Sequence, residues 1–438
     1  MDELKGYKTI FRSLQYRNYR LFFSGQIISL TGTWMQQIAL PWLVYRLTGS
    51  AFLLGVVGFA SQISAFLLSP LAGVMSDRWN RRYILITTQT LAMIQALSLG
   101  FLFFTGDIQV WQIILMAIFL GLINAFDMPT RQAFVVQMVE NRDDLSNAIA
   151  LNSMMFNSAR LVGPSIAGVV IAATNEGICF ILNGISFLFV IASLLMMKLS
   201  PGKTKPRSTH VLHELKEGFS YALGFTPLRH IILLLAIVSL VGMPYIVLMP
   251  VFARKVLHGG PSTLGFLMAA SGIGALTGSI YLASRKNVLG LVRIIPLASA
   301  TFGIGLIAFS LSRLLWLSLP LMFITGLGMI MQMAVCNTVI QTIVDDDKRG
   351  RVMSFYVMAF IGTAPFGSLL AGSLASTIGA PNTLMAGGIL CVLGAAIFAA
   401  KLPDLKKHIR PIYVKLGIIS EVSSGIQAAA NLTVPPER

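Results

Sequence analysis

Twelve long apolar runs, separated by short polar segments, constrain this chain more than any other feature of its sequence. Each approaches the roughly 20 residues that cross a bilayer as a helix. The first half contains Leu21–Tyr45, Ala51–Met75, Tyr83–Thr105, Trp111–Pro129, Ala148–Ala173 and Gly177–Met197. The second half contains Ile231–Phe252, Thr263–Ala283, Leu291–Leu311, Leu315–Val339, Met353–Ile378 and Thr383–Ala400. Only 11% of the residues are charged, against about 25% in a soluble domain. The predicted fold class is an all-α membrane protein with twelve transmembrane helices.

One long polar connection divides these runs into two groups of six. The predicted organisation is an N-terminal segment (1–20), a six-helix bundle (21–197), a linker (198–229), a second six-helix bundle (230–401) and a tail (402–438). Within the linker, apolar residues at helical spacing over 213–225 predict a short amphipathic helix lying on the inner leaflet. The Gly163-Pro164 element and the Ala364-Pro365 element occupy matching places in the two halves, which indicates an internal repeat.

The basic residues determine the expected orientation. The chain carries a formal charge of +16, and on a twelve-helix count nearly all lysines and arginines lie on one side. The exceptions are Arg46, Arg254, Lys255 and Arg313. Because cationic loops stay on the cytoplasmic side, we expect a multi-pass protein of a bacterial-type inner membrane with both termini cytoplasmic. The lipid bilayer explains the basic charge, and nucleic acid is not an expected partner.

The loop after the second run reads Gly73-Val-Met-Ser-Asp77-Arg78-Trp-Asn-Arg81-Arg82. It resembles the signature of the major facilitator superfamily, in which a glycine, an acid and three basic residues stand at fixed spacing. Asn80 replaces the usual glycine, and asparagine tolerates a left-handed turn. The resemblance implies two pseudo-symmetric six-helix bundles and a gate formed by this loop. A plain basic loop would explain the arginines but neither the glycine nor the acid.

A second element lies in the fifth run. Arg160, Gly163, Pro164 and Gly168 resemble the glycine-proline element of drug and metabolite exporters in the same superfamily. The resemblance implies export, and ordinary packing of small residues is the alternative.

A third stretch narrows the resemblance. Residues 127–160, which begin Asp127-Met-Pro129-Thr-Arg131, are similar to the branch that holds enterobactin-type siderophore exporters and macrolide-efflux-like proteins. That branch implies a secondary exporter of an amphiphilic small molecule (a siderophore, drug or metabolite), monomeric and working by alternating access. The alternatives are a lysophospholipid-type flippase, and a non-transporting membrane sensor or assembly factor. An enzyme is not expected, because the sequence shows no Walker sequence, zincin helix or nucleophile elbow.

Charges inside the apolar runs are the most informative single residues. An unpaired charge in hydrocarbon costs at least ~2.5–3.5 kcal/mol, so Arg160 must face a cavity or a partner. Two interpretations remain open: it binds an anionic group of the substrate, or it pairs with Asp127. Many proton-coupled exporters carry an arginine where this chain has Ala117. Acids in or near the apolar runs are scarce, with Asp127 and Glu176 both near helix ends. Asp127, with Arg131, is the first candidate for coupling, with the proton gradient as energy source and no cofactor or metal expected.

In the fold that the family resemblance implies, the first, fourth, seventh and tenth helices line the substrate cavity. Polar residues on these runs, with Asn157 on the fifth, are therefore the candidates for lining it. Neutral amides among aromatic side chains suit a bulky, partly apolar cargo, although hydrogen bonding between helices is the more common role for any one of them. The candidates are Gln26, Thr33, Gln36, Gln37, Asn124, Asn157, Tyr245, Gln332, Asn337 and Gln341.

The loop motif yields a first test. Asp77→Asn should slow cargo movement while leaving the protein folded, because the carboxylate is expected to face the positive amino end of a neighbouring helix. The measurement is the initial rate of transport in proteoliposomes. A variant that transports at the wild-type rate would contradict the gate assignment.

Overall fold

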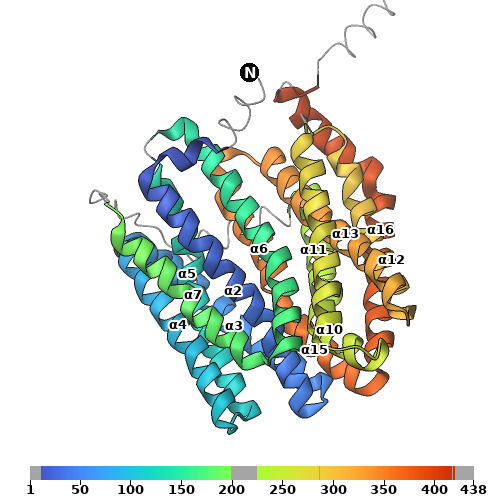
Figure 1. Ribbon diagram of the computed structural model, residues 1–438. Helices are drawn as coiled ribbons and strands as arrows, with labels where there is room; N and C mark the ends of the chain where they lie inside the picture. Colours follow the sequence, from blue (N-terminus) through green and yellow to red (C-terminus); the bar gives the residue numbers. More distant parts are fainter. Residues whose placement is uncertain (1–10, 140, 199–223, 286, 417, 420–438) are drawn as a thin grey trace, which may run out of the picture.

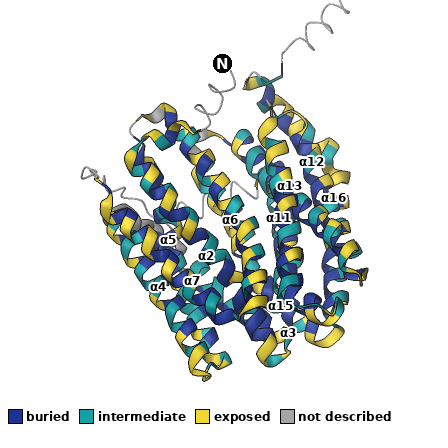
Figure 2. Ribbon diagram, in the orientation of Figure 1, coloured by how far each residue is buried: buried dark blue, intermediate teal, exposed yellow. Residues whose placement is uncertain are grey.

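The computed structural model describes residues 11–139, 141–198, 224–285, 287–416 and 418–419. These residues are helical almost throughout and include no strand. Two groups of helices, blue to green and yellow to red, stand side by side in one bundle (Figure 1). Exposed residues lie along the outside of the bundle (Figure 2). Many of them are large and apolar, as expected for a surface that faces lipid.

The first half contains six long helices joined by short turns. They are α2 (Arg17–Thr48), α3 (Ala51–Arg78), α4 (Arg81–Thr105), α5 (Val110–Met138), α6 (Leu145–Ala173) and α7 (Glu176–Met196). Gly49 ends α2 at a left-handed φ of 62°, and Ser50 caps α3 by accepting the N–H of Leu53 at 3.3 Å. Glycine and serine suit these positions because one tolerates a positive φ and the other satisfies a free helical N–H.

The second half has interrupted helices at two of its six places. Its elements are α9 (Thr226–Ile237), the π-helical turn η3 (Val238–Gly242), α10 (Tyr245–Val251), the π-helical turn η4 (Phe252–Val256), α11 (Pro261–Ser284), α12 (Leu291–Leu311), α13 (Leu315–Ile343), α14 (Asp346–Ile361), α15 (Ala364–Ile378) and α16 (Ala380–Lys415). Pro365 near the start of α15 marks one interruption, because proline lacks the N–H that a continuous helix needs.

The prediction of a twelve-helix membrane fold is confirmed. Within the described ranges, eleven helical segments are long and apolar enough to cross a membrane. The remaining member is α2, whose Gln26, Gln36 and Gln37 reduce its apolar content. The helix predicted over 213–225 lies mostly outside the described residues. The last helix runs past the expected end of its span, with Leu405, Ile409 and Tyr413 buried along one face of the extension.

The described part of the N-terminal segment, from residue 11, packs against the start of α6. Its turn η1 (Arg12–Gln15) lies against η2 (Arg142–Asp144), where the buried carboxylate of Asp144 forms an ion pair with Arg12. The same carboxylate accepts hydrogen bonds from Gln15 Nε2 at 3.1 Å and from the Tyr16 hydroxyl at 2.6 Å. The hydrogen bond to Asp144 is the main cause that raises the pKa of Tyr16 above its ordinary 10.0. We call the end of the bundle that carries η1 and the α3–α4 turn the basic end, and its opposite the far end.

The two halves meet through paired glycines near the far end. Gly168 of α6 packs on Gly265 of α11, where an added Cβ would lie 3.0 Å from the partner's Cα. Gly55 of α3 packs on Gly372 of α15, at 2.9 Å by the same measure. Gly55 and Gly265 are each the fifth residue of their helix. The two contacts are therefore equivalent under the internal repeat, and each requires the absence of a side chain.

Gly55→Ala should separate the halves at the far end. Its Cβ would stand 2.6 Å from the backbone oxygen of Ser368, a contact that α3 can relieve only by moving away from α15. The distance between spin labels at positions 52 and 378, in place of Phe52 and Ile378, should become longer when measured by double electron–electron resonance.

Gly260→Ala is the matched control, because no atom lies within 4 Å of its added Cβ. It should leave the label distance unchanged. An unchanged distance in Gly55→Ala as well would show that the glycine contact does not hold the halves together.

Candidate functional site

The α3–α4 turn is held by caps and backbone contacts rather than by a left-handed residue. Asn80 has φ −67° and ψ 112°, and its side chain accepts the N–H of Arg82 at 3.0 Å as the cap of α4. The left-handed conformation considered for this position is thus corrected: asparagine serves here as an N-cap, one of its preferred roles. Arg81 donates to the Ala133 backbone oxygen at 3.2 Å, and Arg82 to that of Leu195 at 2.8 Å.

For the other three motif residues, the structure gives the position along the helix but not the side-chain contacts. Gly73, Asp77 and Arg78 lie in the last turns of α3, and their side-chain surroundings are outside the described part of the structure. The gate role of the motif therefore stays a prediction.

The candidate coupling residue Asp127 lies in a tight polar network. Its side chain is 2% exposed and pairs with Arg131 one turn later on α5. Thr88 Oγ1 and Gln89 Nε2 of α4 donate to its Oδ1 at 2.9 and 2.7 Å. Asp127 therefore joins α4 to α5 within the first half, and the pairing of Arg160 with Asp127 that the sequence left open is not formed.

Each buried carboxylate among the described side chains has an arginine of its own. Asp127 has Arg131, Asp144 has Arg12, and Glu176 has Arg46. The last pair is bidentate, with N–O distances of 2.7 and 3.1 Å, and joins α2 to α7.

Arg160 lies midway along α6 and has no carboxylate partner among the described residues. Its guanidinium carbon stands 5.8 Å from the ring centre of Trp34 on α2. Its Nη2 lies 3.8 Å from Met329 Sδ on α13, across the boundary between the halves. A cation over an aromatic face is attracted by the ring. These contacts nonetheless leave the hydrogen-bonding capacity of a guanidinium with five donors largely unused.

Gly163 makes the arrangement of Trp34 possible. A Cβ at this glycine would lie 2.5 Å from Trp34 Cβ and 2.9 Å from the Thr31 backbone oxygen. The missing side chain lets α2 approach α6 one turn from Arg160, so that the indole can lie beside the guanidinium. Pro164 and Gly168 follow on the same helix, both buried, and Pro164 does not break α6.

The second half contributes a tyrosine, a serine and a methionine to the same place. The hydroxyl of Tyr245 on α10 lies 3.0 Å from Ser271 Oγ on α11 and 3.9 Å from Met329 Sδ. We call Trp34, Arg160, Tyr245, Ser271 and Met329 the Arg160 cluster. It brings together four helices beside α6, and both halves supply it.

Gln332 lies one turn beyond Met329 on α13. It is 1% exposed, and neither its Nε2 nor its Oε1 has a hydrogen-bond partner in the described structure. A buried unsatisfied amide costs about 1–3 kcal/mol, so such groups mark places where a ligand or water completes the bonding.

Gln36 has a different environment from the other candidate cavity residues. It donates to Gln95 at 3.0 Å and accepts from Asn183 at 2.8 Å, so that a buried chain of amides joins α2, α4 and α7. Both polar groups of its side chain are occupied within the first half, so in this conformation they are not available to a substrate.

The remaining candidate cavity residues range from buried to exposed. Thr33 and Asn157 hydrogen-bond to backbone oxygens of their own helices at 3.0 and 2.9 Å. Gln26 is buried in α2, and Asn124 is half-buried in α5. Gln37 is exposed, as is Gln341, which donates to the half-buried Asn337.

Sequence reasoning missed Trp34, Ser271 and Met329 as parts of the cluster. Trp34 lies beside Arg160 because α2 packs closely against α6 at Gly163, and no local sequence pattern reveals that contact. Gln95 and Asn183 were also missed, although a polar amide in each of two apolar runs was a usable signal.

Comparison with known proteins places the chain in a family. Residues 8–412 match the family model described as transmembrane secretion effector, a group within the major facilitator superfamily. The chain belongs to this transporter family. The resemblance stated from the sequence is therefore confirmed, and so is the transporter class.

Several curated relatives cover nearly the full length of the transporter. The staphyloferrin A transporter of Staphylococcus aureus is 29% identical and aligns over 86% of this chain and 95% of its own. The multidrug efflux pump Tap of Mycolicibacterium fortuitum is 26% identical, over 85% and 93%. Macrolide efflux protein A of Streptococcus pyogenes is 21% identical, over 90% and 98%.

Solved structures share the fold at low sequence identity. A bacterial homologue of the human lysosomal transporter Spinster, in an inward-facing and unoccupied conformation, matches with a TM-score of 0.71 and 16% identity, over 90% of this chain and 98% of that one. A POT family transporter in complex with a thioalcohol-conjugated peptide gives a TM-score of 0.73 at 12% identity, over 89% and 96%.

The amide chain predicts a measurable loss of stability. Gln95→Leu removes the partner at one end of this chain and leaves the buried Nε2 of Gln36 without an acceptor, so the free energy of unfolding should fall by about 1–3 kcal/mol. Gln37→Leu, at an exposed position on the same helix as Gln36, is the control. Denaturant unfolding in detergent measures both, and equal stability of the two variants would contradict a structural role for the chain.

Proposed function

We propose that this transporter exports an amphiphilic small molecule that carries an anionic group, and that Arg160 binds that group. The observation that carries the proposal is the arginine in the middle of α6 with no carboxylate partner among the described residues, where three other arginines each have one. A cation held inside the membrane needs a partner. A cargo carboxylate or similar anion would provide it.

The surroundings of Arg160 favour a cargo that is apolar as well as charged. Trp34 and Met329 offer an aromatic face and a polarisable sulfur, while the Tyr245 hydroxyl and the free amide of Gln332 offer hydrogen bonds. A site with a few polar groups among apolar walls is typical of binding sites for drug-sized molecules. The relatives named for a siderophore, drugs and macrolides support export of such a cargo.

Alternating access is the proposed mechanism. Both halves contribute to the Arg160 cluster, and the equivalent glycine pairs Gly168–Gly265 and Gly55–Gly372 lie on the far-end side of it. Rocking of one half on the other about this cluster would separate the glycines and open the site to the far end. We propose that the basic end is cytoplasmic in a bacterial inner membrane, which makes the far end the release side.

Proton coupling is the proposed energy source, and Asp127 with Arg131 is the candidate pair. Protonation of Asp127 would remove the negative charge that holds Arg131. It would also weaken the hydrogen bonds that the Asp127 carboxylate accepts from Thr88 and Gln89, which would loosen α4 from α5. We also propose that the transporter acts as a monomer.

The experiment is transport in proteoliposomes under an imposed pH gradient, across a panel of siderophores, dyes, macrolides and lysolipids. For the anionic cargo that the wild type moves, Arg160→Ala should weaken apparent affinity on the order of 10- to 100-fold, because a charge-assisted hydrogen bond is worth about 1.5–3 kcal/mol. Arg160→Lys should retain part of the affinity, since it keeps the charge and loses the planar fork.

Arg254→Ala is the control for the loss of one positive charge, because Arg254 is exposed near the end of η4. It should transport like the wild type. Unchanged affinity in Arg160→Ala would reduce Arg160 to a packing role, and movement of lysolipids alone would favour the flippase alternative.

A further inference from the structure

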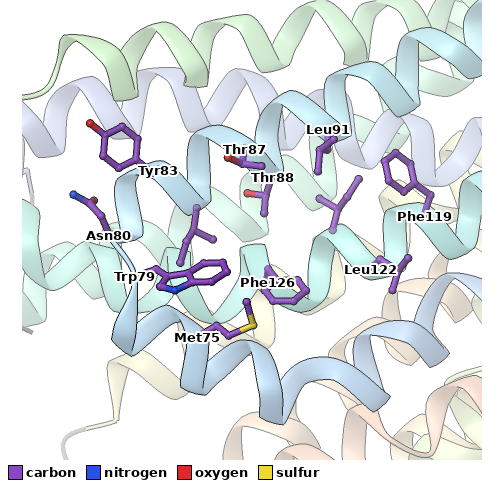
Figure 3. A pocket seen from close by; sticks show the side chains of 12 residues that line it. Met75, Trp79, Asn80, Tyr83, Thr87, Thr88, Leu91, Phe119, Leu122 and Phe126 are labelled. Carbon is purple, nitrogen blue, oxygen red and sulfur yellow. The ribbon is translucent and has the colours of Figure 1, made fainter. Parts of the chain in front are cut away.

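A lateral groove lies on the outside of the first half, apart from the Arg160 cluster. It is formed by the last turns of α3, the first three turns of α4 and the middle of α5 (Figure 3). Its volume is about 550 Å³, within the roughly 300–1,000 Å³ of sites that bind small molecules. The lining is apolar and aromatic apart from Asn80 and two threonines.

The groove has the length of one leaflet. Along α4 its lining runs from Asn80 in the turn to Leu91, and eleven residues of helix extend about 16 Å. Half of a hydrocarbon core of about 30 Å is about 15 Å. A chain that begins at the basic end and follows the groove would therefore end near the bilayer midplane.

The mouth at the basic end has the chemistry of a membrane interface. Trp79 is 58% exposed and Tyr83 is 69% exposed, and both aromatic side chains line this part of the groove (Figure 3). Tryptophan and tyrosine concentrate at the level of lipid headgroups. Arg81 and Arg82 stand in the same turn, and basic residues there attract phosphate.

The inner wall of the groove touches the network around Asp127. Thr88 lines the groove and donates from its hydroxyl to Asp127 Oδ1 at 2.9 Å. Thr87, its neighbour, also lines the groove but is exposed. A ligand in the groove would thus pack directly against Thr88, which joins α4 to the buried carboxylate of Asp127.

We propose that the groove binds one acyl chain of a membrane phospholipid from the leaflet at the basic end. The headgroup lies at the Trp79–Tyr83 mouth, the chain follows α4 to Leu91, and the phospholipid is a bound component of the protein rather than its cargo. The occupied groove supports α4 against α5 through Thr88. The match in length, the apolar walls and the basic aromatic mouth together favour a phospholipid over a soluble apolar ligand.

The test is photolabelling in vesicles of phosphatidylethanolamine and phosphatidylglycerol. The probe is phosphatidylglycerol with a diazirine at the end of one acyl chain. Peptides covering 81–91 and 119–126 should be labelled more strongly than peptides from the lipid-facing surface of α16. Excess unlabelled phosphatidylglycerol should reduce that labelling.

Thr87→Trp should fill the groove and lower this labelling to the level seen on α16. Ile94→Trp is the matched control, because Ile94 lies two turns further along the same face of α4, beyond the groove, and is exposed. It should label like the wild type. Size-exclusion chromatography of both variants checks that each remains folded.

Three results would overturn the proposal. Labelling spread evenly over all lipid-facing helices would show that no site exists. Undiminished labelling in Thr87→Trp would show that the chain lies elsewhere. Labelling of the groove by a soluble apolar photoreactive dye, with none by the phospholipid, would make it a site for a different class of ligand.

Discussion

The cost of an unpaired charge in hydrocarbon governs how this transporter is built. A cation or carboxylate buried in the membrane is tolerated only with a partner of opposite charge or a polar cavity. The chain obeys this rule at Asp127, Asp144 and Glu176, each of which is buried and paired with an arginine. The Arg46–Glu176 pair joins α2 to α7, and the Arg12–Asp144 pair joins η1 to η2. The Asp127–Arg131 pair lies within α5, and hydrogen bonds from Thr88 and Gln89 join it to α4. Arg160 has aromatic and sulfur contacts instead, and this difference is the reason for proposing that it binds cargo.

The same solvent explains how the halves can be both joined and separable. Lipid supplies no hydrophobic force between helices, so close packing must come from small residues. Gly168 with Gly265 and Gly55 with Gly372 provide it at two equivalent places near the far end. Contacts of this kind are made by backbone atoms without interlocking side chains. They can therefore be broken and restored without rearranging a core, and they lie where the proposed mechanism requires them to open.

Periodicity and composition predicted much of the fold, because a bilayer-spanning helix leaves a long apolar run whatever its neighbours are. The twelve runs were found in this way, whereas the loop motif was identified by its resemblance to the family signature. The ends of helices were harder to place. The extension of α16 to Lys415 depends on burying Leu405 and Ile409 against neighbouring helices, a contact that no local run of apolar residues reveals. The cap formed by Asn80 likewise depends on where α4 begins.

The site was harder still to predict from sequence. Single polar residues in apolar runs are correctly identified as special, but their partners lie on helices far away in the chain. Gln36 turns toward Gln95 and Asn183, whereas Gln332 is left with free polar atoms, and nothing in their own runs distinguishes the two. Arg160 was identified because its charge is costly wherever it points. Trp34 was not predicted to lie beside Arg160, because that contact arises only from the approach of α2 to α6 at Gly163.

We have proposed that the guanidinium of Arg160 is reserved for an anion on the cargo. Solid-state NMR in lipid bilayers can measure this contact directly, through the dipolar coupling between ¹⁵N-labelled arginine side chains and an amphiphilic cargo with one ¹³C-labelled carboxylate. The account predicts a coupling at hydrogen-bond distance in the wild type that is absent in Arg160→Lys. Saturating cargo with no such coupling, or a coupling that survives the substitution, would contradict it.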